Sequence, residues 1–332
     1  MATKKELIKQ TCGNNFNLKQ ESQEFFAPTN IALIKYWGKS DFELNLPATP
    51  SVSITSKNLG TKTKIIQSNT DKCFVGGVEI AVETSFYKRV FDFINLFRDA
   101  LGVKQKFAVY TSNNFPTASG LASSASGFCA LVLAINDVFG LKLENDRQKL
   151  ATLARLGSGS ACRSVFGGEC KYVTWENDIV KPVIFPDGDF RNNIEVLVLV
   201  LSNREKKTSS REAMVLTQQK SVLYQQWLLQ TQEDYKKFYT AKFFEEFGEV
   251  CESNSLFLHR AINEVGIDYF NNRTREMIDF IQKQRTQRNL PVYLTIDAGA
   301  NVCVFFEKKN YQKVLQTLLL SGLVVADEVV WL

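Results

Sequence analysis

Residues 113–127 place the strongest constraint on how this chain can fold. An Asn-Asn-Phe-Pro opening leads into a run made almost wholly of Ala, Ser and Gly, and a helical pattern follows from Phe128 to Phe139 and stops at Gly140. Small side chains let a ligand approach the backbone, and the free N–H groups of a first helical turn, together with the helix dipole, favour an anion. The segment therefore predicts a phosphate site, although a close-packed helix start would need the same small residues. It is not a Walker A loop, because no Gly-Lys-Ser/Thr follows.

The composition excludes several functional classes. At 332 residues, with 45% hydrophobic and 23% charged residues, the chain has an ordinary globular composition and enough length for two domains. The net charge is only +5 and no long basic run occurs, so nucleic acid is not indicated as a partner. Seven scattered Cys without a Cys-x-x-Cys pair, and a single His, argue against a disulfide framework or a zinc site. With neither a signal-peptide core nor a membrane-length apolar run, we expect a cytoplasmic protein that does not bind a membrane.

The order of predicted elements indicates an α+β chain. The first 24 residues read as a polar extension that could be flexible, with a short helix near Lys4 to Gln10. A turn-rich stretch at 185–190 separates two ordered regions, 25–187 and 188–332. Strands and helices are mixed on both sides of this boundary, which favours α+β architecture in each part.

Three other stretches carry groups suited to phosphate chemistry. Residues 30–39 hold two Lys and a Tyr that can converge on an anion. Residues 157–163 form a second small-residue helix entry, and Arg163 at its end can grip a carboxylate or phosphate in bidentate fashion. Asp297 ends an apolar strand before a Gly-containing turn, where it could act as a base or simply cap the turn. Three anion-binding segments and one carboxylate predict phosphoryl-transfer chemistry on two phosphorylated molecules.

In this order and spacing, the four stretches resemble the diphosphomevalonate decarboxylase family of the GHMP kinase superfamily. The resemblance runs from Ala27 to about Phe305 and leaves the N-terminal extension without a counterpart. It implies a GHMP-kinase N-terminal domain with a left-handed βαβ unit over residues 25–187. It also implies a ferredoxin-like C-terminal domain over residues 188–332, with the active site between the two. ATP, Mg²⁺ and a homodimer are further implications of the family.

The reaction implied by the resemblance begins with phosphorylation of the 3-hydroxyl of 5-diphosphomevalonate by ATP. Loss of phosphate and CO2 then gives isopentenyl diphosphate. Three alternatives remain open: a 5-phosphomevalonate decarboxylase, a mevalonate 3-kinase-like enzyme that stops at the 3-phosphate, and a ligand-binding relative without activity. Arg89 and Lys39 would distinguish the first of these, whereas the presence of both Asp297 and Arg163 speaks against the other two.

By motif, the resemblance also implies roles for single residues. Asp297 takes or orients the proton of the 3-hydroxyl, Arg163 binds the substrate carboxylate, and Lys35 lies near the reacting groups. The residues implied to hold the substrate diphosphate are Tyr36, Lys39, Arg89, Ser158 and Ser160. Those implied to contact the phosphates of ATP are Ser119, Gly120, Ser123, Ser124, Ser209, Ser210 and Arg211. Arg89 could instead be a solvated position on its helix, and we interpret the lone His259 as a residue for packing or a surface hydrogen bond.

Overall fold

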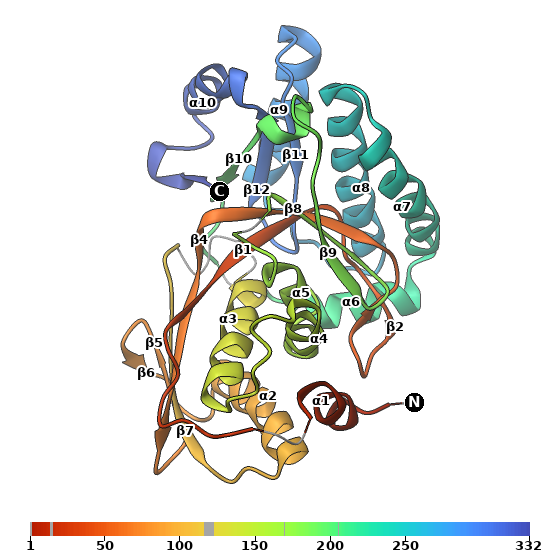
Figure 1. Ribbon diagram of the computed structural model, residues 1–332. Coiled ribbons are helices and arrows are strands. Elements are labelled where there is room, and N and C mark those ends of the chain that lie inside the picture. Colours follow the sequence, from red (N-terminus) through yellow and green to blue (C-terminus); the bar gives the residue numbers. More distant parts are fainter. Residues whose placement is uncertain (1, 14–15, 116–122, 169, 205) are drawn as a thin grey trace.

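The structure is a computed structural model that describes residues 2–13, 16–115, 123–168, 170–204 and 206–332 (Figure 1). Its strands are β1 (Phe25–Ile34), β2 (Lys39–Asp41), β3 (Leu46–Pro47), β4 (Ser51–Ser68), β5 (Lys72–Val75), β6 (Val78–Glu79), β7 (Lys106–Asn113), β8 (Tyr172–Glu176), β9 (Ile179–Val183), β10 (Ile194–Leu199), β11 (Tyr293–Thr295), β12 (Val302–Glu307) and β13 (Val329–Trp331). Its α-helices are α1 (Lys4–Cys12), α2 (Ser85–Leu101), α3 (Ser123–Val138), α4 (Arg147–Gly157), α5 (Ala161–Ser164), α6 (Ser210–Lys220), α7 (Val222–Thr240), α8 (Phe244–Glu264), α9 (Asn272–Arg288) and α10 (Tyr311–Leu320). None of the helices in these ranges is both long and apolar enough to cross a lipid bilayer.

The larger sheet is built around the 18-residue strand β4. Its path is β6-β5-β7-β4-β8-β9, and β1 also pairs with β4. Strand β4 runs unbroken from Ser51 to Ser68, while its partner β1 shifts register between Pro28 and Asn30. Gly60 lies at this point, and a Cβ there would come within 2.2 Å of the carbonyl oxygen of Ala27. A side chain would therefore separate the two strands.

Among the described strands of this sheet, β5 and β7 are the one parallel pair, and α2 lies between them in the chain. This is the predicted βαβ unit; its left-handed crossover stays a prediction. Helix α2 begins after the N-cap Thr84 and ends at the left-handed Gly102, as the spacing of its apolar residues predicts. Aromatic side chains of α2 and α3 pack together beneath the sheet, with Phe93 and Phe128 in an edge-to-face contact.

The second sheet has the order β11-β12-β10-β13, and all of its neighbouring strands are antiparallel. Numbered along the chain, this is the order 2-3-1-4, with helices between the first and second strands and between the third and fourth. The predicted ferredoxin-like arrangement is therefore confirmed. Figure 1 shows this sheet and its helices above the larger sheet, whose own helices α2 to α5 lie below.

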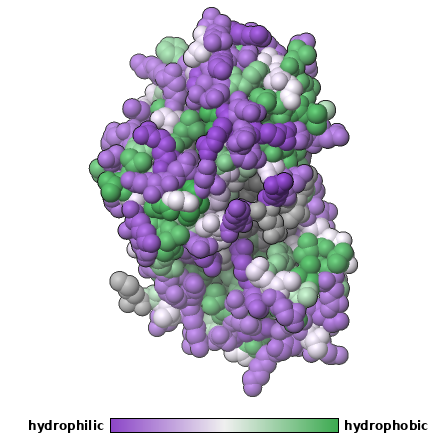
Figure 2. Space-filling model, turned by 180° about the vertical axis from the view of Figure 1, so that it is seen from behind, coloured by the Kyte–Doolittle hydropathy of each residue, from purple (hydrophilic) through white to green (hydrophobic). Residues whose placement is uncertain are grey.

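The two sheets share part of one core. Residues of β1 and β4, such as Leu33 and Val52, belong to the same buried cluster as Val198 of β10 and Phe305 of β12. The cores therefore do not separate at residue 187, and the division of the chain into 25–187 and 188–332 stays a prediction. On the outside, Figure 2 shows apolar side chains in separate patches on a largely hydrophilic face.

The N-terminal extension packs against the part of the molecule that contains the larger sheet. Its polar composition had suggested a flexible segment. Helix α1 begins with a capping box between Thr3 and Glu6, and Ile8 is fully buried. After the helix, the backbone N–H of Asn17 donates to Phe139 and that of Ser22 to Ile65. The apolar face of α1 and the backbone hydrogen bonds that follow it therefore hold the segment in place.

Candidate active site

A buried ion pair joins the ends of two strands that belong to different sheets. Lys35 directly follows β1, Asp297 stands two residues after β11, and the Lys35 Nζ lies 2.6 Å from Asp297 Oδ1. The Lys35 side chain is 3% exposed and that of Asp297 28%, so the carboxylate is open to a ligand while the ammonium is not. The pair connects positions 262 residues apart, which brings together the first and last of the four predicted stretches.

Arg163 is a buried cation whose described partners are all neutral. It lies on α5 and is 2% exposed. Its Nη1 donates to Ser51 Oγ at 2.7 Å, and its Nε and Nη2 both donate to Asn30 Oδ1. Burial lowers the pKa of Arg163, and the nearby Asp297 works in the opposite direction. A desolvated positive charge without a carboxylate partner favours an anionic ligand.

A second cationic group forms around Lys39. Its Nζ donates to Asn45 Oδ1 at 2.6 Å, and burial, with repulsion from Arg211 and Lys4, lowers its pKa to about 8. Arg211 also lowers the pKa of Arg89, although burial is the larger cause there. The resemblance implied a nucleotide contact for Arg211, but the structure groups its charge with Lys39 and Arg89.

Arg89 has its guanidinium 5.3 Å from the ring centre of Phe128, although its α2 position is exposed. The side chain is thus directed toward the start of α3 rather than away from the protein. The alternative of a purely solvated helix face is therefore disfavoured by the geometry.

The two small-residue segments meet at their serines. Ser158 Oγ lies 3.5 Å from Ser124 Oγ and 3.4 Å from Ser160 Oγ. Gly159 lets Tyr36 lie against this segment, since a Cβ there would come within 2.4 Å of the Tyr36 hydroxyl. Burial raises the pKa of Tyr36, so its phenol stays protonated and can donate a hydrogen bond.

The structure describes only some of the residues predicted to contact the phosphates of ATP. Ser123 and Ser124 form the partly exposed first turn of α3, whereas Ser119 and Gly120 lie outside the described residues. Ser209 caps α6 by accepting the N–H of Glu212 at 3.2 Å. Each of these two serine oxygens accepts one hydrogen bond, that of Ser210 from Lys206, and each hydroxyl keeps an O–H that can donate.

Lys206 is a site residue that the sequence interpretation missed. Its Nζ donates to Ser210 Oγ at 2.7 Å and to the carbonyl of Ala298, next to Asp297, at 3.1 Å. Burial lowers its pKa, and Asp297 partly offsets that effect. The Lys-Lys dipeptide before the predicted Ser209–Ser210 helix start was the available signal.

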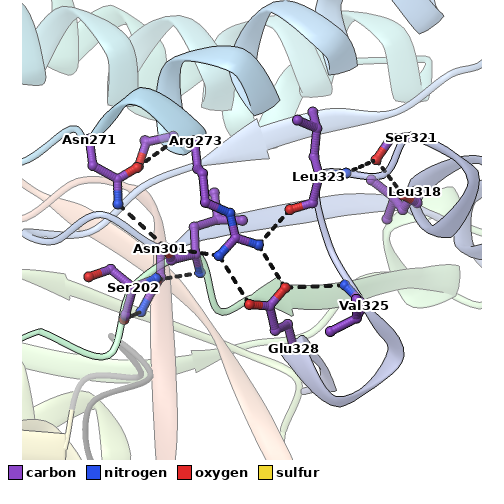
Figure 3. A network of polar contacts seen from close by, with 11 residues as sticks. Ser202, Asn271, Arg273, Asn301, Leu318, Ser321, Leu323, Val325 and Glu328 are labelled. Atoms are coloured by element: carbon purple, nitrogen blue, oxygen red, sulfur yellow. Dashed lines mark hydrogen bonds and ion pairs between the residues drawn. The ribbon is translucent and has the colours of Figure 1, made fainter.

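A polar network holds the ends of the two loops that carry Lys206 and Asp297 (Figure 3). Asn301 Oδ1 accepts the backbone N–H groups of Leu201 and Ser202 at 2.7 and 2.9 Å. On the other side, Arg273 forms a two-point ion pair with Glu328 and also donates to the carbonyl of Leu201. The C-terminal segment thus supports the start of the loop that presents Lys206.

The donor set suits Mg²⁺ that arrives bound to a triphosphate. Among the described residues, no three His, Cys, Asp or Glu side chains come together as a metal cluster. Mg²⁺ usually keeps several waters and binds through one or two protein oxygens plus substrate phosphates. The hydroxyls of Ser123 and Ser124 and the partly exposed carboxylate of Asp297 are oxygen donors of the kind that fit that mode.

Comparison with known proteins agrees with this geometry. The family model of the diphosphomevalonate decarboxylase-like N-terminal domain matches residues 27–180, and that of the mevalonate 5-diphosphate decarboxylase C-terminal domain matches residues 196–325. The diphosphomevalonate decarboxylase of Debaryomyces hansenii is 34% identical over 87% of this chain and 80% of its own length. That of Candida albicans is 33% identical over 88% of this chain and 86% of its own.

Solved structures give the same result. The mevalonate diphosphate decarboxylase of Staphylococcus aureus matches with a TM-score of 0.84 at 30% identity, covering 94% of this chain and 95% of that one. A complex of MDDEF with MVAPP, AMPPCP and magnesium matches with a TM-score of 0.84 at 33% identity, covering 94% and 96%.

Fold and site together define a protein of the GHMP kinase fold with a lysine–carboxylate pair beside anion-binding groups. Within that class, the chain belongs to the diphosphomevalonate decarboxylase family.

Proposed function

We propose that this protein catalyses the ATP-dependent decarboxylation of 5-diphosphomevalonate to isopentenyl diphosphate, with release of ADP, phosphate and CO2. The observation that carries the proposal is the Lys35–Asp297 pair beside the unpaired, buried Arg163. Family membership supports the reaction, and the structure of MDDEF with MVAPP, AMPPCP and magnesium supports ATP and Mg²⁺ as the other components.

Asp297 is the group that handles the proton of the substrate 3-hydroxyl. Its carboxylate is the partly exposed member of the pair, whereas Lys35 is buried. The Lys35 Nζ binds Oδ1, and Oδ2, which has no hydrogen-bond donor among the described residues, can accept the hydroxyl proton. The hydroxyl oxygen then attacks the terminal phosphoryl group of ATP, so that ADP leaves.

Arg163 directs the second half of the reaction by holding the substrate carboxylate. Its guanidinium is fixed by Ser51 and Asn30, and this leaves its charge available to an anion. When the 3-phosphate departs with its bonding electrons, C3 becomes electron-deficient. The electrons of the C–CO2 bond then form the new double bond, and CO2 leaves. A carboxylate held in place keeps this bond aligned with the leaving phosphate.

The pocket for the substrate diphosphate contains the three cations Lys39, Arg89 and Arg211. The hydroxyls of Tyr36, Ser158 and Ser160 complete it. Burial lowers the pKa of both Lys39 and Arg89, and the charge of Arg211 lowers it further, so this group of cations needs an anion of more than one charge for compensation. A terminal diphosphate supplies that charge better than a monophosphate does. This supports 5-diphosphomevalonate over 5-phosphomevalonate as the substrate.

We therefore expect the diphosphate substrate to have a kcat/KM about 100-fold above that of the monophosphate, since each charge-assisted contact adds roughly tenfold. Arg89→Ala should reduce this preference about tenfold by the same reasoning. Lys88→Ala, an exposed neighbour on α2, is the matched control and should leave the ratio unchanged. Steady-state assays with both substrates measure it; a higher kcat/KM for the monophosphate would replace the proposed substrate by the alternative one.

On the nucleotide side, Ser123 and Ser124 at the first turn of α3 bind the ATP phosphates, as the helix dipole and free N–H groups favour. Lys206 and Ser210 line the other side of the triphosphate. They contact each other, and Lys206 also donates to the carbonyl of Ala298, next to Asp297. Mg²⁺ bound to the triphosphate neutralises part of its charge. Ser119 and Gly120 belong to the same proposal by motif.

The lowered pKa of Lys39 predicts a pH dependence with a definite sign. The ammonium is charged below its pKa of about 8 and loses its charge as the pH rises through that value. Because kcat/KM reports the free enzyme, it should fall about tenfold above pH 8, whereas kcat should not. A Lys39→Arg variant keeps its charge and should lose this fall. A kcat/KM profile that is flat from pH 7 to 9.5 in the unsubstituted protein would refute the role of Lys39.

Further proposals concern the whole molecule. The free cysteines of the described residues support a reducing, cytoplasmic location. The homodimer and the division into domains at residue 187 are proposed from the family resemblance.

A further inference from the structure

The peptide directly before Asp297 is held by side chains of α8 rather than by a neighbouring strand. Strand β11 ends at Thr295, so the polar backbone groups of the fully buried Ile296 need other partners. The Ile296 N–H donates to Ser255 Oγ at 2.9 Å, and Ser255 Oγ lies 3.2 Å from the Ile296 carbonyl oxygen. His259 Nε2 lies 3.2 Å from the same oxygen. Ser255 and His259 are one helical turn apart, so they act from one face of α8.

His259 can only be a hydrogen-bond donor at this position. The carbonyl oxygen of Ile296 accepts, so the proton resides on Nε2 of the ring. The side chain is 2% exposed and packs against Phe270, with the ring centres 4.4 Å apart. Burial lowers the pKa of His259 to about 4, which keeps the ring neutral near pH 7. Nδ1 has no hydrogen-bond partner among the described residues. A buried histidine with one ring nitrogen unsatisfied lowers the stability of the fold. Packing alone therefore does not explain a histidine at position 259.

The same helix also holds the other member of the ion pair. Asn254 Oδ1 accepts the backbone N–H of Lys35 at 2.9 Å. Its amide nitrogen donates to Thr231 Oγ1 and Asp234 Oδ2, so the orientation of the amide is determined. Asn254 and Ser255 are both fully buried. Adjacent residues of α8 therefore fix the backbones of Lys35 and Ile296, which come from different sheets.

We propose that Ser255 and His259 are positioning residues that set the distance and direction of the Asp297 carboxylate relative to Lys35 and to the substrate hydroxyl. This inference rests on the proposed role of Asp297. The expected signature is a loss of kcat without a loss of substrate affinity, because neither residue faces the ligand. A displacement of the carboxylate by a fraction of an ångström lowers the rate of proton transfer while the diphosphate and carboxylate contacts persist.

The test compares four variants of the full-length protein. His259→Leu removes the donor at similar volume, and His259→Gln keeps an N–H near the position of Nε2. Ser255→Ala removes both hydrogen bonds to Ile296, and Ser253→Ala makes the same change on the exposed face of α8 as a matched control. kcat and KM for both substrates, and the thermal midpoint, are measured for each variant.

We expect His259→Leu and Ser255→Ala to lower kcat about tenfold or more, with both KM values within threefold. His259→Gln should recover most of the kcat, and Ser253→Ala should behave like the unsubstituted protein. Unchanged kcat in both His259→Leu and Ser255→Ala would refute the positioning role. So would a loss that follows the thermal midpoint and is not recovered by His259→Gln. An unsubstituted protein without ATP-dependent decarboxylation would instead refute the proposed function.

Discussion

Replacing Asp297 by Asn should lower kcat about 10³-fold while the Kd for 5-diphosphomevalonate stays within a few fold. The amide can still accept a hydrogen bond from Lys35, so the site keeps its shape, but it cannot take a proton from the substrate hydroxyl. Lys35, which is 3% exposed, would lose its ionic partner, and we expect a lower thermal midpoint as a second effect. Single-turnover kinetics and calorimetric titration of the substrate separate the two quantities.

The control for this variant is Asp279→Asn, which makes the same change on the exposed face of α9. It should keep both kcat and the thermal midpoint. An Asp297→Asn variant with near-normal kcat would show that another group handles the proton. A large rise in Kd at unchanged kcat would instead make Asp297 a binding residue.

Replacing Arg163 by Met should separate activity from stability. We expect kcat/KM to fall about 10³-fold, because the substrate carboxylate loses a desolvated charge-assisted contact. Stability should be unchanged or higher, because the variant removes a buried charge that has only neutral partners. If the role of Arg163 were only to stabilise the fold, its replacement would lower stability and activity together.

Arg163→Lys should not restore the activity. The guanidinium uses three nitrogens to reach Ser51 and Asn30, and a lysine ammonium cannot reproduce that planar fork. Arg260→Met, at an exposed position of α8, serves as the control. If Arg163→Met were active, or if it unfolded well below the unsubstituted protein, the carboxylate-binding role would have to be abandoned.

Long periodic segments made much of the fold predictable. Helix α2 was predicted at its observed position because its apolar spacing is regular and both caps are recognisable in the sequence. Strand β9 was missed, since its five residues include Lys181 and Pro182 and carry little apolar pattern. Strand β13 has only three residues and depends on pairing with β10, so its local sequence could not reveal it.

The residue types of the site were predictable, but their arrangement was not. Motifs identified Lys35 and Asp297, yet only the fold brings two strand ends 262 residues apart to 2.6 Å. The grouping of Arg211 with Lys39 and Arg89 depends on how α6 packs beside β2, which carries Lys39, and no local pattern encodes that packing. Lys206 was missed because a Lys-Lys dipeptide is also typical of a solvated surface, and only the fold brings its ammonium to the carbonyl next to Asp297. The importance of α8 was hidden for a related reason, since His259 acts through the backbone of another segment.

The most direct test of the account is the ratio of CO2 to ADP released when the protein turns over ATP with 5-diphosphomevalonate. Carboxyl-labelled substrate reports CO2, and a coupled assay reports ADP in the same reaction. We predict one CO2, one phosphate and one isopentenyl diphosphate for each ADP, with the release of both ADP and CO2 about 10³-fold slower in Asp297→Asn. ADP formed without CO2 would mean that the reaction stops at the 3-phosphate, and would contradict the role given to Arg163.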